Sequence, residues 1–128
     1  MLAVFIGILM QAASAPPPTD ASPATAPYAA RADYRQWPSA YDWYLATPNL
    51  VRGRGVEGRA VLRCKINDIG DLAGCKIVEE TPKGLGFGKA AMALRTKTRM
   101  QPTPKGQTRW VLVPFAWTKT GPYIPPSL

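Results

Sequence analysis

The chain has 128 residues and a formal net charge of +8, with 16 Lys and Arg against 8 Asp and Glu. A chain of this length holds one hydrophobic core, and a hydrophobic content of 46% excludes disorder throughout. Histidine is absent, which removes the commonest general base and the commonest metal ligand of proteins. Because the basic residues are dispersed rather than clustered, nucleic acid is not an expected partner.

The N-terminus carries a short apolar run over residues 2–10, followed by small residues up to Ala15. The run is too short to cross a bilayer, which takes about 20 apolar residues, and the small residues are typical of the end of a secretory signal peptide. We interpret residues 1–15 as a signal peptide and the protein as periplasmic. A buried N-terminal helix is the alternative. An uncleaved N-terminus, or a true start upstream of Met1, would instead tether the protein to the inner membrane.

Residues 16–36 are rich in Pro and Ala, which favours a disordered linker leading to a domain over residues 37–120, with residues 121–128 as a tail. The domain opens with four aromatic side chains over residues 37–44. These either cover the core or form an exposed binding patch, and we favour core cover because a small domain needs the buried area. Residues 48–52 then predict a short helical turn.

Residues 59–66 alternate between basic and apolar side chains, and Asn67 to Gly70 predict a turn into a second strand over residues 71–78. A register centred between Ile69 and Gly70 sets Cys64 opposite Cys75. The side chains that share the apolar face in this register are Leu62, Cys64, Ile66, Ala73, Cys75 and Ile77. In an exported protein, a facing cysteine pair predicts a disulfide, with two reduced core cysteines as the alternative.

Apolar residues recur at helical spacing from Phe87 onward and predict a helix over residues 87–99. A third strand is expected over residues 108–117, with Val111, Val113, Phe115 and Trp117 on one face. Pro114 lies within it and has no N–H to donate to a ladder. The third strand is therefore expected at a sheet edge or at a bulge.

The sequence shows no active site. The glycines of residues 84–88 precede a helix, but the Lys-Ser/Thr that a phosphate-binding loop requires is missing. The acidic residues are scattered, and no Cys/His or paired-carboxylate arrangement occurs. We expect no enzyme activity, no cofactor and no metal site.

Taken together, the order and spacing of several segments over residues 45–117 resemble the C-terminal domain of TonB energy transducers. The segments that carry the resemblance are Thr47-Pro48 with Val51, Gly55-Val-Glu-Gly58, the strand Ala60–Ile66, Gly70, Ala90-Ala91 with Leu94, Met100-Gln-Pro102 and Val111 to Phe115. A subgroup with a paired-cysteine hairpin and a Gly-Phe-Gly before the helix is most similar to Cys64, Cys75 and Gly86-Phe87-Gly88. A complete transducer also has a transmembrane helix with a histidine and a long proline-rich span, and these are not found in this sequence.

The resemblance implies an α+β fold with a three-stranded antiparallel sheet in the order 2-1-3, and with one main helix and a short N-terminal helical segment on one face. It implies that the third strand binds a peptide segment of an outer-membrane TonB-dependent transporter, the TonB box, by strand addition. The residues at this edge are Arg109, Trp110, Val111, Leu112, Val113 and Phe115. The expected role is energy-dependent transport across the outer membrane. The alternative is a periplasmic interaction or scaffolding module of the same fold that binds another envelope protein, or a homodimer formed through the edge strand.

Overall fold

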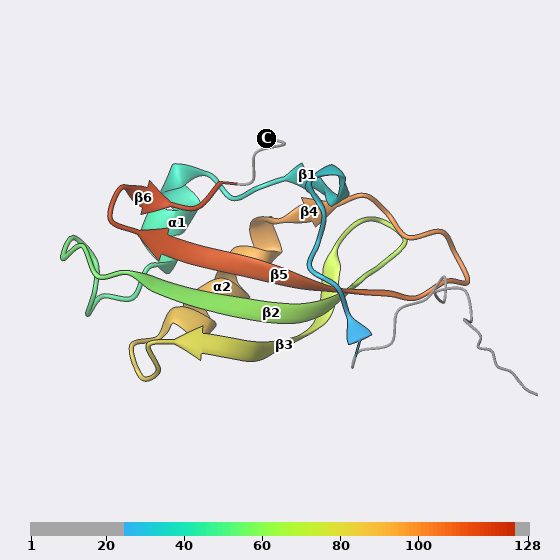
Figure 1. Ribbon diagram of the computed structural model, residues 1–128. Helices are drawn as coiled ribbons and strands as arrows, with labels where there is room; N and C mark the ends of the chain where they lie inside the picture. The colour runs from blue at the N-terminus through green and yellow to red at the C-terminus, as the bar shows by residue number, and fades with distance from the viewer. Residues whose placement is uncertain (1–24, 125–128) are drawn as a thin grey trace, which may run out of the picture.

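The structure is a computed structural model that describes residues 25–124. The expected signal peptide and residues 16–24 of the expected linker lie outside the described residues. The elements follow in the order η2 (Arg31–Asp33), β1 (Tyr34–Gln36), α1 (Ala40–Ala46), β2 (Gly58–Ile66), β3 (Leu72–Thr81), α2 (Phe87–Leu94), η3 (Arg95–Lys97), β4 (Arg99–Met100), β5 (Arg109–Thr118) and β6 (Gly121–Pro122) (Figure 1). Among the described residues, no helix has the length and apolar character needed to cross a membrane.

The main sheet is antiparallel, with strand order β3-β2-β5-β6. The predicted first, second and third strands are β2, β3 and β5, and they lie in the predicted order 2-1-3. The prediction of three strands is wrong, because β6 adds a fourth. β6 lies in the stretch expected as a tail. It forms because the chain turns tightly after β5: the Thr118 hydroxyl lies 2.6 Å from the Gly121 carbonyl oxygen, and Gly121 adopts a φ of +125° that favours glycine.

Both helices pack on one face of the main sheet, behind it in Figure 1. Trp43 of α1 packs against Phe115 of β5, with ring centroids 6.0 Å apart. Phe87 of α2 packs against Trp117 of β5, with ring centroids 4.8 Å apart. The predicted inward face of the third strand is confirmed, because all four of its side chains are buried. The fully buried large side chains of the domain include Leu62, Ile66, Phe87, Leu94, Met100, Val111, Val113 and Phe115.

The first helix is α1, upstream of the turn that the sequence predicted as helical. Ser39 caps it: its hydroxyl accepts from the Asp42 N–H at 3.1 Å, and Asp42 accepts in return from the Ser39 N–H at 2.9 Å. The Ser39 N–H, with the hydroxyl, lowers the pKa of the Asp42 carboxyl. Residues 48–52 form only a turn, in which the Val51 and Arg52 N–H groups donate to the Pro48 carbonyl.

The aromatic segment that contains α1 is split between core and surface. Trp43 is buried and Trp37 packs against the core, whereas Tyr41 and Tyr44 are 65% and 56% exposed. The core-cover interpretation therefore holds for the two tryptophans. Trp43 lies on the buried face of α1, and Trp37, which precedes the helix, stacks on Phe115 with ring centroids 5.1 Å apart.

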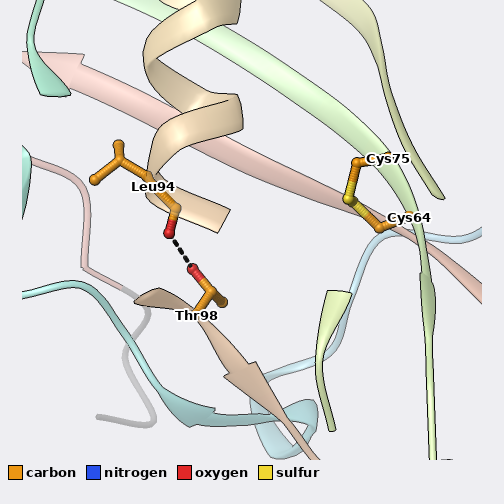
Figure 2. The surroundings of a disulfide bond; sticks show 4 residues. All are labelled: Cys64, Cys75, Leu94 and Thr98. Carbon is orange, nitrogen blue, oxygen red and sulfur yellow. Dashed lines mark hydrogen bonds between the residues drawn. A yellow bond between two sulfur atoms is a disulfide. The ribbon is translucent and has the colours of Figure 1, made fainter. Parts of the chain in front are cut away.

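α2 ends at Leu94, so the prediction of a helix up to Arg99 is wrong at its C-terminal end. A single 3₁₀ turn, η3, follows, and the chain is extended at Thr98. The buried Thr98 hydroxyl donates to the Leu94 carbonyl at 3.1 Å and satisfies one of the carbonyls at the helix end (Figure 2). Residues 99–100 form β4, which pairs with β1. β1 itself lies in the stretch that was expected to be a disordered linker. This long-range pairing competes with helix formation beyond Leu94.

The hairpin of β2 and β3 carries the predicted disulfide between Cys64 and Cys75, with Cα atoms 4.2 Å apart (Figure 2). Its register differs from the prediction near the turn. Lys65 faces Ala73 while Arg63 faces Lys76, so one extra residue is accommodated at Gly74, whose φ is +59°. This bulge places Leu72, rather than Ala73, in the core.

Beyond Gly74 the predicted register holds for two pairs, Arg63 with Lys76 and Leu62 with Ile77, and it shifts again at Val61, which faces Glu79. Ile77 faces Leu62, as expected, but its side chain remains 44% exposed. The apolar face of β3 therefore extends beyond the cover that α2 provides, whereas the predicted inward side chains of β2, Leu62, Cys64 and Ile66, are fully buried.

Candidate functional site

The outer edge of β5 is the candidate site. β5 pairs with β2 in one uninterrupted register, from Ile66 facing Arg109 to Gly58 facing Trp117. Backbone groups alternate in direction along an antiparallel strand, so every second residue turns its N–H and C=O away from β2. Leu112 is one of these: its N–H donates to the Pro27 carbonyl at 2.8 Å, and its carbonyl accepts from the Ala29 N–H at 2.9 Å. By parity, residues 110, 114 and 116 also face outward.

The six predicted edge residues have three different environments. The side chains of Val111, Val113 and Phe115 are fully buried beneath the helices, so these residues can offer a ligand no side-chain contact. Trp110 and Leu112 lie on the opposite face of the sheet and are half-buried. Their side chains are the part of the predicted site that remains accessible, whereas the outward backbone groups of Leu112 already bind Pro27 and Ala29.

Arg109, the sixth predicted residue, is already engaged. Its guanidinium forms an ion pair with Asp33 at 2.6 Å, and the Asp33 side chain is largely buried. Asp33 also accepts from the Ala30 N–H, and its carbonyl accepts from the Gln101 N–H at 2.7 Å. Arg109 thus anchors the segment before β1 to the start of β5, a role that sequence reasoning did not predict.

Pro114 lies at an outward-facing position. It faces Val61 without any break in the β2–β5 register, so its missing N–H removes no bond to β2. The sequence prediction that the proline marks a sheet edge agrees with this geometry. The consequence for binding is that a strand added beside β5 finds no donor at residue 114.

Two segments of the chain itself already cover parts of this edge. Residues 27–29 run beside Leu112, where Tyr28 forms a parallel bridge (Figure 1). At the other end, β6 pairs with Trp117 and Thr118, and the Tyr123 N–H donates to the Ala116 carbonyl at 2.9 Å. Within residues 25–124, no strand pairs with Trp110 or Pro114 on the side away from β2.

The outer face of the sheet next to this edge is basic. Arg59, Arg63 and Lys65 of β2 alternate with the buried side chains of that strand. Arg59 donates to Glu79 at 2.9 Å and to the Tyr28 hydroxyl at 3.0 Å. Tyr28 therefore extends from Leu112 on β5 to Arg59 on β2. Val61 lies between these two positions on the outer face of the sheet, yet its side chain is fully buried.

The described residues contain no cluster of three or more Cys, His, Asp or Glu side chains that would hold a metal ion. A cleft of about 350 Å³ lies between α1 and the β5–β6 turn and is lined by Trp43, Tyr44, Arg52, Trp117 and Lys119, among others. Its lining includes no carboxylate, cysteine or histidine.

Residues 45–118, more than half of the chain, match the family described as the Gram-negative bacterial TonB protein C-terminal. The chain belongs to this TonB C-terminal domain family. The family is non-enzymatic, so the chain is not an enzyme. The match runs from the last residues of α1 to the end of β5 and thus contains the candidate edge, whereas residues 27–29 and β6 lie outside it.

Among solved structures, the chain is similar to the solution NMR structure of the Pseudomonas aeruginosa TonB C-terminal domain. The two are 21% identical with a TM-score of 0.39, and the similarity covers 56% of this chain and 72% of that chain. No curated protein gives a significant match to this chain.

Proposed function

We propose that this TonB C-terminal domain acts in the periplasm, where it binds extended peptide segments of outer-membrane TonB-dependent transporters by adding them as a strand to the outer edge of β5. Through this contact it takes part in a TonB-like, energy-dependent transport across the outer membrane. Strand addition gives affinity through main-chain hydrogen bonds and selectivity through alternating side chains.

The observation that carries the proposal is the outward-facing backbone of Leu112. Its N–H and C=O already bind an extended stretch of backbone, residues 27–29, so this position of the edge accepts a strand. The half-buried side chains of Trp110 and Leu112, together with the basic row on β2, supply the apolar and charged contacts for one face of such a peptide. The membership of the family makes a transporter segment the expected ligand.

A second candidate is a periplasmic interaction module of the same fold that has no part in energy transduction. If this module acts by pairing with another protein, an edge-to-edge homodimer fits the structure less well than a short peptide. β6 and residues 27–29 interrupt the long continuous edge that homodimer pairing requires. A short peptide needs only a few residues of free edge. The two candidates differ in whether transporter peptides bind at all.

The test is a titration of the full chain with synthetic TonB-box peptides in wild type and in a Leu112→Pro variant. Because proline at the neighbouring outward position 114 leaves the β2–β5 register intact, Leu112→Pro is expected to fold and to lose only the outward donor. We expect the affinity to fall by about threefold, because the lost donor leaves a peptide carbonyl unpaired but also weakens the hold of residues 27–29 on the same edge. Leu112→Val keeps the N–H and is the matched control. Equal affinity of all three proteins would contradict the proposal.

A further inference from the structure

We propose that the outer edge of β5 at Leu112 is a strand-exchange site, for which the chain's own residues 27–29 compete with the incoming peptide. The proposal rests on the function proposed above. In the free domain, residues 27–29 occupy the binding edge and act as an internal ligand. The ligand that fits is an extended segment that runs parallel to β5 and places an aromatic side chain over Arg59.

The backbone contacts of residues 27–29 have the form of a bound peptide. The Pro27 carbonyl and the Ala29 N–H bracket Leu112 on its outward side, at 2.8 Å and 2.9 Å. This is the hydrogen-bond pattern of one residue in a parallel ladder, with Tyr28 between the two bonding groups. An incoming parallel strand would need the same two groups of Leu112. Both ligands cannot bind them at the same time.

The Tyr28 side chain makes the selective contact. Its hydroxyl accepts from Arg59, and the Arg59 guanidinium lies 5.8 Å from the centre of its ring. Glu79 holds Arg59 from the other side at 2.9 Å and so fixes the guanidinium in place. Because Tyr28 is itself 51% exposed, the contact is open at the surface and can be exchanged. A peptide with Tyr or Phe at this place would meet a pre-positioned cation.

The internal ligand is held weakly enough to be displaced. Residues 27–29 are held by two backbone hydrogen bonds, by the contact of Tyr28 with Arg59 and by the partly buried Ala29 side chain. The Asp33–Arg109 ion pair is a separate anchor that lies beyond them. Residues 27–29 can therefore leave the edge while η2 stays attached. The apparent affinity for a peptide equals the affinity of the free edge multiplied by the fraction of molecules in which residues 27–29 have left it.

The test compares full-length wild type with Ala29→Pro, which removes the N–H that donates to Leu112, and with Ala29→Ser, which keeps it. Two probes are used: a TonB-box peptide, and a synthetic peptide of residues 25–33 of this chain. We expect the TonB-box peptide to bind Ala29→Pro about fivefold more tightly than wild type, which corresponds to one lost hydrogen bond. Ala29→Ser is expected to bind like wild type. Tyr28→Ala, at an exposed position, serves as a second releasing variant should Ala29→Pro perturb the fold.

The peptide of residues 25–33 is expected to shift the Leu112 amide signal in Ala29→Pro and to leave it unchanged in wild type. Equal affinity of wild type and both releasing variants for the TonB-box peptide would overturn the exchange site while the proposed function stands. Binding of the 25–33 peptide at Leu112 without any TonB-box binding would support the internal ligand and reject the proposed function. Failure of the 25–33 peptide to perturb Leu112 in either releasing variant would also overturn the inference.

Discussion

Phe87→Ala is expected to lower the free energy of unfolding by about 4 kcal/mol, the largest effect of any single substitution considered for this domain. Phe87 begins α2, is fully buried, and packs its ring against Trp117 with centroids 4.8 Å apart. It therefore joins the helix to the strand that carries the binding edge. Domains of this size are stable by about 5–15 kcal/mol, so the loss removes a large share of the total.

The expected loss is measured by urea unfolding, with an unchanged dependence on denaturant showing that two-state behaviour is retained. Leu45→Ala, at a side chain that is 57% exposed on α1, is the control and should change stability by no more than about 0.5 kcal/mol. A loss below about 1.5 kcal/mol for Phe87→Ala would contradict the packing described here.

A related effect is expected at Gly58, because a Cβ added there would overlap the ring of Phe87. Gly58→Ala is therefore destabilising while Phe87 is present and nearly neutral in a Phe87→Ala background. A double-mutant cycle measures this coupling, which should lie within the 0.5–3 kcal/mol that is typical of residues in contact. Simple additivity of the two substitutions would show that the two residues do not touch.

The second large effect is expected from the Cys64→Ala/Cys75→Ala double variant, which should lose about 3 kcal/mol of unfolding free energy in the chain-entropy description. The two cysteines are 11 residues apart, so the bond closes the short loop around the β2–β3 turn. Cys64 is fully buried, and its replacement also leaves a small void.

The measurement is again unfolding by denaturant, with reduction of the wild-type disulfide as an independent way to the same change. Reduced wild type should unfold at nearly the same denaturant concentration as the double variant. Two thiols that react in denatured, unreduced material would contradict the disulfide itself. Equal stability of the oxidised and reduced forms would show that the bond contributes nothing.

The features of the fold that depend on neighbouring residues in the chain could be predicted from the sequence. Alternation along β2 and β5 identified their buried faces, and the facing cysteines identified the disulfide. Pro114 indicated a sheet edge because a missing N–H is tolerated only where no ladder bond is needed. The Ser39–Asp42 capping box was readable in the sequence and would have placed α1 correctly.

The features that were missed depend on partners far away in the chain. Thr98 continues a helical period, but β4 pairs with β1 and ends the helix before it. Gly74 shifts the hairpin register by one residue, which alternation alone does not reveal. Tyr28 lies in a Pro/Ala-rich stretch that predicts disorder, yet its contacts are with Leu112 and Arg59. The occupied state of the binding edge follows from these long-range contacts, so it could only be found in the structure.

Nuclear Overhauser effects between a bound TonB-box peptide and isotope-labelled protein show directly whether the peptide adds as a strand to the outer edge of β5. We expect contacts from the peptide backbone to the amide protons of Trp110 and Leu112, with the signals of Tyr28 shifting as residues 27–29 leave the edge. Contacts to Trp43 and Trp117 in the cleft beside α1, with the Leu112 amide unchanged, would contradict this strand addition.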